Sequence, residues 1–181
     1  MASLYVHGKS FIHRLIWLTP MMEGWLAASK YLIQARGKPM KFGHVLYKGK
    51  KFQFRNCDST AIKEVLVDEE YDFLTDYLNR CINPIIVDVG AHIGTFSVWL
   101  NSKNPKAQIL MLEANPQSYD VLMHNMQHNL SSHKWQAINK AAWQSHEKVN
   151  LCVMGDSMGN KVSSQGTVQI EGITFTTLID I

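Results

Sequence analysis

The feature that most constrains this chain is the stretch IIVDVGAHIGTFSVW, residues 85–99, in which an apolar run leads into two glycines. The run from Ile85 to Val89 is short and nearly continuous, as expected for a strand that is covered on both faces of a parallel sheet. Apolar residues then recur at helical spacing, at Phe96, Trp99 and Leu100. The stretch therefore predicts a strand, a tight turn and a helix in immediate succession.

A second unit of the same kind follows. Gln108 to Leu112 reads as another buried strand, and Asn115-Pro116 is typical of a helix start, because asparagine caps the first turn and proline fits within it. The next helix has one apolar face, formed by Tyr119, Leu122, Met123, Met126 and Leu130. Two consecutive strand-helix units predict a parallel sheet with right-handed crossovers.

Later segments favour further strands. A third parallel strand is expected at 135–139, and KVNLCVM at 148–154 and TVQIEGITFTTL at 167–178 also read as strands. The second of these is expected to fold back at Glu171-Gly172. The segment 155–166 between them is rich in glycine and serine and is expected to form a flexible loop.

The residues before the first parallel strand predict helices and a β-hairpin. The segment 44–55 alternates around a Lys-Gly turn, which is typical of a hairpin, and a helix is expected over 71–81, ending before Asn83-Pro84. The hydrophobic segment 11–33 is interrupted by charged residues and by a proline, so it predicts neither a membrane-spanning helix nor a signal peptide. Six of its residues share one helical face that we expect to pack on the core, with docking to a membrane surface as an alternative: Met22, Trp25, Leu26, Ser29, Leu32 and Ile33.

Composition narrows the function classes. The 181 residues suit one globular domain, and a net charge of only +3 without a dense basic stripe argues against a nucleic-acid surface. Cys57, Cys81 and Cys152 are odd in number and widely spaced, which favours reduced thiols in a cytoplasmic protein. A metal site is not expected, because His124, His128 and His133 lack a carboxylate at ligand spacing.

The glycine turn predicts a small-molecule site. Parallel strands end beside helix N-termini, and Gly90 and Gly94 leave room there for a ligand to approach the backbone. The pattern is not GxGxxG, so a dinucleotide pyrophosphate is disfavoured. Glu113 follows the second strand and could accept hydrogen bonds from both hydroxyls of a ribose, so an adenosine without phosphates remains.

These residues resemble a known family. Asp88-Val-Gly-Ala-His-Ile-Gly94 resembles motif I of class I S-adenosylmethionine-dependent methyltransferases. The segments VDVGAHIGTFS, LEANPQSYDVLMHNMQHN and INKAAW are similar to the FkbM family of these enzymes, as is the upstream FQFRNCDSTAIKEVLVDEEYDFL. The resemblance runs from about Phe52 onward. It implies a Rossmann-like α/β class I methyltransferase fold with S-adenosyl-L-methionine as the cofactor.

The resemblance also implies the residues of a cofactor site. Asp88, Gly90 and Gly94, with Ala91 and His92 between them, would lie under the methionine part of the cofactor. Further along the chain, Glu113 would hold the ribose, and Ala114 and Asn115 would lie near the adenosine. Ala141 would lie near the adenine edge. His92 stands where the family usually has asparagine.

The expected activity is methylation of a hydroxyl on a sugar, glycan or polyketide-like acceptor. Such a reaction needs a base to remove the hydroxyl proton, for which the sequence offers His92, Asp156 and His146 without choosing among them. A non-catalytic module with the same fold and an NAD-dependent oxidoreductase remain as alternatives. Titration with adenosylhomocysteine and with NAD separates the three.

We expect two parts in the chain. Residues 1–83 would form the N-terminal helices and hairpin lead-in, and residues 84–181 an incomplete cofactor-binding domain with three parallel strands, the N-terminal half of the fold. The family's later acidic motif would lie past Ile181. The strand at 85–89 would then be a bare apolar edge, which invites self-association or capping by the N-terminal segment.

Overall fold

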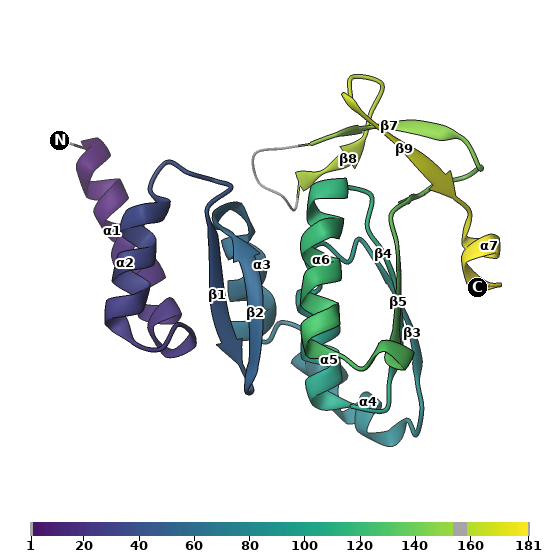
Figure 1. The fold of residues 1–181 in the computed structure, drawn as a ribbon, viewed down its shortest axis with the longest axis horizontal. Coiled ribbons are helices and arrows are strands. Elements are labelled where there is room, and N and C mark those ends of the chain that lie inside the picture. Colours follow the sequence, from purple (N-terminus) through teal and green to yellow (C-terminus); the bar gives the residue numbers. More distant parts are fainter. Residues whose placement is uncertain (1, 154–158, 181) are drawn as a thin grey trace.

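The structure is a computed structural model that describes residues 2–153 and 159–180. A helical pair, a β-hairpin, a three-stranded sheet with two long helices and a small upper sheet follow one another along the chain (Figure 1). The hairpin lies between the helical pair and the helix-covered sheet. This arrangement places the lead-in beside the glycine turn rather than apart from it.

The central sheet is parallel, as predicted. It has the order β3-β4-β5, and Val87 pairs with Leu110, which in turn pairs with Gln136. Its strands and the helices between them have these bounds: β3 Ile85–Val89, α5 Thr95–Lys103, β4 Gln108–Leu112, α6 Pro116–Asn129 and β5 Trp135–Ile138. The Asn115 side chain accepts a hydrogen bond of 3.0 Å from the Gln117 N–H, which confirms the predicted cap.

The two faces of this sheet differ. Alternate side chains pack with α5 and α6 into the main core, in which Trp99, Met111 and Leu122 are fully buried. On the other face Ile85 is 75% exposed, while Leu112 packs under Ile173 and Leu178. Among the described strands β3 pairs with β4 alone, so the predicted bare apolar edge is present and the N-terminal segment does not cap it.

The small upper sheet corrects one prediction. It has the order β6-β9-β7-β8. Its strand β9 continues through Glu171-Gly172 instead of folding back there. Gly172 fits because an added Cβ would lie 2.7 Å from the Ser145 carbonyl oxygen. Thr174 then caps a helix where a strand was expected. The bounds are β6 Ala141–Ala142, β7 Lys148–Cys152, β8 Lys161–Val162, β9 Val168–Ile173 and α7 Phe175–Ile179.

The lead-in contains the predicted hairpin, with β1 at Phe42–Tyr47 and β2 at Lys50–Arg55. It docks on α6 through Asn125, whose side chain accepts from the Gln53 N–H at 2.8 Å and donates to the Gln53 carbonyl at 2.9 Å. Short helical pieces follow: α3 Ser59–Ala61, a π-helical stretch Ile62–Val67, a 3-10 turn Asp72–Leu74 and α4 Thr75–Arg80. The last two occupy the helix predicted over 71–81.

The N-terminal helices correct a second prediction. They are α1 Ala2–Leu18 and α2 Trp25–Ala35, joined through a 3-10 turn at Thr19–Met21. Only part of the expected core-facing set is buried, because Trp25, Leu26 and Ile33 are 62%, 67% and 68% exposed. The side of α2 that is buried faces β1, where Gly43 leaves room for the Tyr31 ring. The buried residues of α2 are Ala28, Tyr31, Leu32 and Ala35. In the described residues no helix is long and apolar enough to cross a bilayer.

Candidate functional site

The glycine turn is held by the neighbouring strand. The N–H groups of Gly90 and Ala91 both donate to the Leu112 carbonyl oxygen, at 2.8 and 3.0 Å. Gly90 has a φ of +84°, and an added Cβ there would meet no atom within 4 Å. The turn therefore presents bare backbone to open space beyond the ends of the strands.

Gly94 has a different role. Its φ is +88°, and an added Cβ would lie 2.5 Å from Met126 Cε and 2.8 Å from Leu122 Cδ1. The residue stands just before α5 and allows that helix to pack closely against α6. Gly94 thus serves packing beneath the site, whereas Gly90 faces the site itself.

Glu113 is fixed at the edge of the turn. Its side chain accepts hydrogen bonds of 2.8 Å from the His92 N–H and from the Asn115 N–H, one at each carboxylate oxygen. Asn139 in turn donates to the Glu113 carbonyl oxygen at 2.8 Å. The carboxylate is buried and oriented, and each of its oxygens has a second lone pair available for a ligand.

Asp88 ends on the same side of the sheet. Its pKa is raised to about 6, mainly by burial and also by the nearby charge of Glu113, while the hydrogen bond from the Ser97 hydroxyl at 3.2 Å acts in the opposite direction. The carboxyl group therefore titrates near pH 6. In its ionised form it makes this part of the site favourable for a cation.

The His92 ring connects the turn to the lead-in. Its Nε2 atom lies 3.2 Å from Asp58 Oδ1, and Asp58 is fully buried. Arg55 donates to the Asp58 carboxylate from its backbone N–H, Nε and Nη2, at 2.7 to 2.9 Å. His92 has a φ of +53°, an uncommon conformation for this residue type, and these contacts from two segments hold it there.

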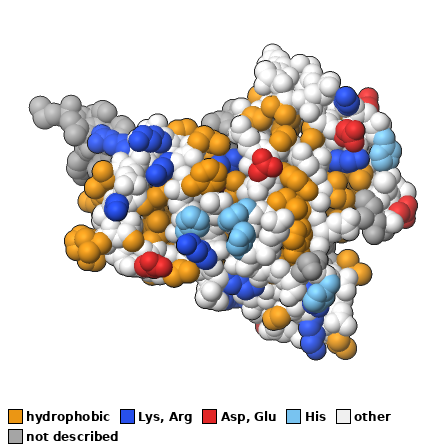
Figure 2. Space-filling view, in the orientation of Figure 1, with side chains coloured by type: hydrophobic (Ala, Val, Ile, Leu, Met, Phe, Trp, Pro, Cys, Tyr) orange, Lys and Arg blue, Asp and Glu red, His pale blue; other side chains and the backbone are white. Residues whose placement is uncertain are grey.

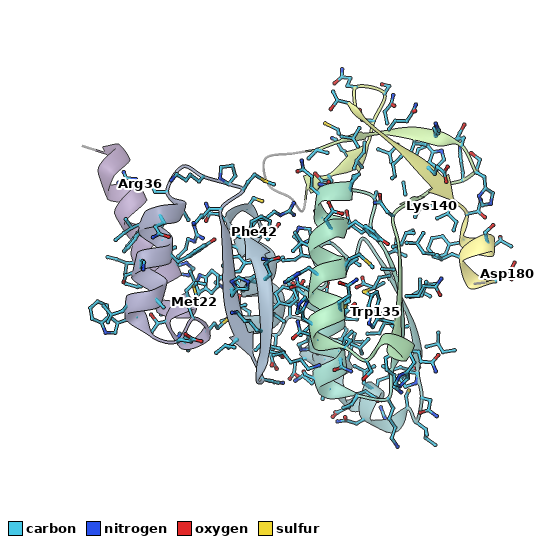
Figure 3. All side chains as sticks on the ribbon, in the orientation of Figure 1. Met22, Arg36, Phe42, Trp135, Lys140 and Asp180 are labelled. Carbon is cyan, nitrogen blue, oxygen red and sulfur yellow. The ribbon has the colours of Figure 1, made fainter. Side chains whose placement is uncertain are left out.

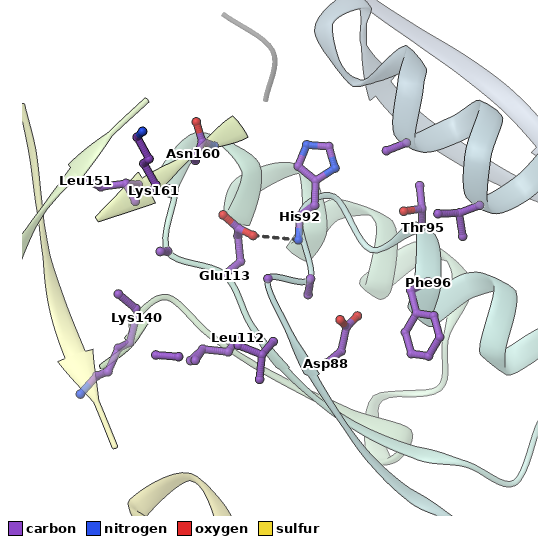
Figure 4. Close-up of a pocket in the computed structure, with 18 of the residues that line it drawn as sticks. Asp88, His92, Thr95, Phe96, Leu112, Glu113, Lys140, Leu151, Asn160 and Lys161 are labelled. Atoms are coloured by element: carbon purple, nitrogen blue, oxygen red, sulfur yellow. Dashed lines mark hydrogen bonds between the residues drawn. The ribbon is translucent and has the colours of Figure 1, made fainter. Parts of the chain in front are cut away.

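Asp88, His92 and Glu113 border one cavity of about 370 Å³ (Figure 4). Seven of the nine predicted cofactor residues line it: Asp88, Gly90, Ala91, His92, Glu113, Ala114 and Ala141. Gly94 packs below it, and Asn115 caps α6 with its side chain. The volume is at the lower end of the range of roughly 300 to 1,000 Å³ for small-molecule pockets.

The sequence analysis missed other walls of the cavity. Tyr71 comes from the lead-in. Phe96 comes from α5, and Lys140, Asn160 and Lys161 come from β8 or from residues just before β6 and β8 (Figure 4). The helical spacing around Tyr71 gave a signal for a helix but none for a site. Lys161 lies in the segment that was read as a flexible loop, and Lys140 lies in INKAAW, which was quoted for the family resemblance without a role for the lysine.

The candidate bases are separated by the fold. His92 lines the cavity, whereas His146 is exposed and its ring contacts the Thr177 hydroxyl at 2.8 Å. Asp156 lies outside the described residues. His124 and His128 stack on α6 with ring centroids 4.2 Å apart, and the described part of the chain holds no group of three or more potential ligands arranged for a metal.

A family model for the methyltransferase small domain matches residues 62–157, just over half of the chain. The chain belongs to the methyltransferase small domain family. The matched residues include the glycine turn and Glu113, so the family model covers most of the cavity lining. The predicted Rossmann-like α/β fold is confirmed, since the structure contains the parallel three-stranded sheet with its helices.

The chain is similar to one curated protein and to several solved structures. The chain is 45% identical over 64 residues to the methyltransferase sdnD of Sordaria araneosa, a match that covers 35% of this chain and 23% of that relative. It is also similar to solved structures. M. jannaschii TYW2 in complex with AdoMet is 20% identical with a TM-score of 0.40, covering 54% of this chain and 42% of the other. A SAM-dependent methyltransferase from Agrobacterium tumefaciens is 11% identical with a TM-score of 0.42, covering 56% and 33%.

Proposed function

We propose that this chain binds S-adenosylmethionine in the 370 Å³ cavity and takes part in methylation of a hydroxyl on a sugar, glycan or polyketide-like acceptor in the cytoplasm. Membership of the methyltransferase small domain family supports the donor and the reaction type. The match covers 23% of the length of the curated relative, so the methylation activity is a proposal for this chain. The closer resemblance to FkbM methyltransferases supports the acceptor class.

The observation that carries the proposal is the pairing of Gly90 with Glu113. Open backbone at the first turn and an oriented carboxylate at the second strand face the same cavity. A ribose needs such an acceptor, and a ligand without phosphates needs no glycine in the second position of a GxGxxG turn. The residues present therefore fit an adenosine-type cofactor.

Each part of the cavity can be given a role. Glu113 would accept from the ribose hydroxyls, and Asp88 would face the charged methionine part. Ala114 and Ala141 offer small apolar surface for the adenine. When bound, S-adenosylmethionine supplies a methyl group activated by a positively charged sulfur, and the domain's task is to orient it and exclude water.

Titration calorimetry with adenosylhomocysteine tests the cofactor. We expect binding by the wild-type chain and a loss of about 1 to 3 kcal/mol in Glu113→Ala, because the ribose loses its acceptor. Asp120→Ala is the matched control, since this exposed carboxylate on α6 does not line the cavity. Thermal unfolding of each variant without ligand checks that Glu113→Ala remains folded. Heat from NAD but not from adenosylhomocysteine would contradict the proposal.

The acceptor needs a separate experiment. A methyl-labelled donor is offered to the full chain with hydroxylated glycans, polyketide-like alcohols and RNA in parallel. We expect label in the alcohols or glycans. Label in RNA would overturn the acceptor class and leave the cofactor site standing, while binding of the cofactor without any transfer would favour a non-catalytic module.

A further inference from the structure

The helical pair at the N-terminus carries an unusual exposed surface. Five large apolar side chains on α1 and α2 are each 60% to 69% exposed, and we call them the apolar face: Ile12, Ile16, Trp25, Leu26 and Ile33. Ile12 and Ile16 are four residues apart on α1, and Leu26 and Ile33 are seven apart on α2, so each pair lies on one stripe of its helix. Soluble surfaces rarely gather such side chains unless something binds them.

The same segment holds most of the excess positive charge. Residues 1–41 contain six lysines and arginines against the single acidic residue Glu23, whereas the remaining 140 residues contain twelve against fourteen. Lys30, Arg36 and Lys38 are exposed, and none of them forms an ion pair with any residue in 2–153 or 159–180. Basic and hydrophobic side chains lie close together over this end of the molecule in Figure 2.

The position of the pair leaves this surface accessible. α1 and α2 form the end of the molecule farthest from α7, with Met22 and Arg36 near opposite ends of α2 (Figure 3). Their buried side packs on the β-hairpin through residues such as Tyr31. No residue before Ala61 lines the cofactor cavity, so a partner on the apolar face would leave that cavity open.

We propose that the α1–α2 pair docks on an anionic lipid bilayer surface. A tryptophan with leucine and isoleucine beside lysine and arginine is the composition of an interfacial helix, in which the apolar side chains enter the headgroup region and the basic side chains meet acidic lipids. The excess of positive charge favours a surface with a dense negative charge, such as acidic headgroups, over a neutral protein partner. The proposal is independent of the methyl acceptor, and it would bring the cofactor cavity close to a membrane.

Vesicle flotation tests the proposal with the full chain. We expect binding to vesicles of phosphatidylcholine with phosphatidylserine, and weaker binding to phosphatidylcholine alone or at high salt, since salt screens the basic residues. The triple variant Trp25→Ser, Leu26→Ser, Ile33→Ser should lose at least about tenfold in partition to the anionic vesicles. Lys30→Glu with Lys38→Glu should lose binding to the anionic vesicles while the apolar face is intact.

A matched control separates this face from general stickiness. Phe73 and Ile82 are each 76% exposed but lie in the lead-in near α4, and changing both to serine should leave vesicle binding unchanged. Circular dichroism and thermal unfolding show whether each variant is folded. Equal vesicle binding by the wild type and the triple variant overturns the proposal. So does concentration-dependent dimerisation that the triple variant abolishes without any vesicle binding, because a second copy would then be the occupant.

Discussion

The two faces of the parallel sheet come from the same three strands and differ sharply. On one face Met111 is fully buried under α5 and α6, whereas on the other Ile85 is 75% exposed and α7 covers only the end near Leu112. The cavity that we propose for the cofactor lies where the strands end, and its floor rests on the covered face through Gly94. The site is therefore supported from one side, and the other side is apolar surface available to a partner.

The largest expected difference between the faces is in stability. Met111→Ala should lower the free energy of unfolding by about 2 to 5 kcal/mol, because it leaves a cavity in the core. Ile85→Ala on the open face should change it by less than about 0.5 kcal/mol. Urea unfolding measures both. Similar losses in the two variants would show that the open face is covered in solution.

The two glycines sharpen the comparison. Gly94→Ala should cost about 1 to 2 kcal/mol for the left-handed backbone and about 1 to 3 kcal/mol more for overpacking against Met126 and Leu122. Gly90→Ala meets no neighbouring atom and should cost only the backbone part, while its methyl group obstructs the cofactor. Urea unfolding and titration with adenosylhomocysteine should thus separate a stability defect from a binding defect.

Asp88 predicts a pH effect. Its folded-state pKa of about 6 is above the usual value, so the folded chain binds this proton more tightly than the unfolded chain does. Stability should therefore fall as the pH rises from about 4 to above 6. Asp88→Asn should be more stable than the wild type at pH 8 by about 1 to 3 kcal/mol, and the difference should vanish near pH 4. Thermal unfolding of both proteins between pH 4 and pH 8 measures this difference. If the stability difference between Asp88→Asn and the wild type does not change with pH, the raised pKa of Asp88 is contradicted.

The smallest effect on stability and the clearest on association is expected at the β3 edge. Val87 is 40% exposed on β3, an apolar edge strand that pairs on one side only among the described strands, and such an edge favours pairing with a second copy. We expect the wild-type chain to self-associate in light scattering and Val87→Lys to shift it toward the monomer with unchanged urea unfolding. A wild-type chain that stays monomeric at all concentrations would show that twist or solvation protects this edge.

The sequence predicted what depends on local patterns. The bounds of β3 and β4, the Asn115 cap and the 44–55 hairpin follow from apolar spacing and turn chemistry within a few residues. The glycine turn and Glu113 each follow a strand that the local pattern predicts. Because parallel strands end at the same edge of the sheet, the two were expected to lie close together.

The sequence could not predict what depends on distant contacts. Helical spacing placed Trp25, Leu26 and Ile33 on the core-facing side of α2, where they are not. The docking of Tyr31 against Gly43, a contact between distant residues, decides which side of α2 is buried. The Arg55–Asp58 pair lies more than 30 residues before His92, so no spacing rule connects them. Gly172 likewise sits in a straight strand because Ser145 closes over it, whereas a glycine after an acid read as a turn.

The contact between Asp58 and His92 bears on where this protein can be cut. A shortened chain beginning at Pro84 would retain the glycine turn and Glu113 but would lose the carboxylate that holds the His92 ring, and also the Gln53 backbone that Asn125 binds. Recombination or engineering that exchanges the front of the molecule must carry both partners together. The lead-in is therefore a structural part of the pocket, although it is distant from the glycine turn in sequence.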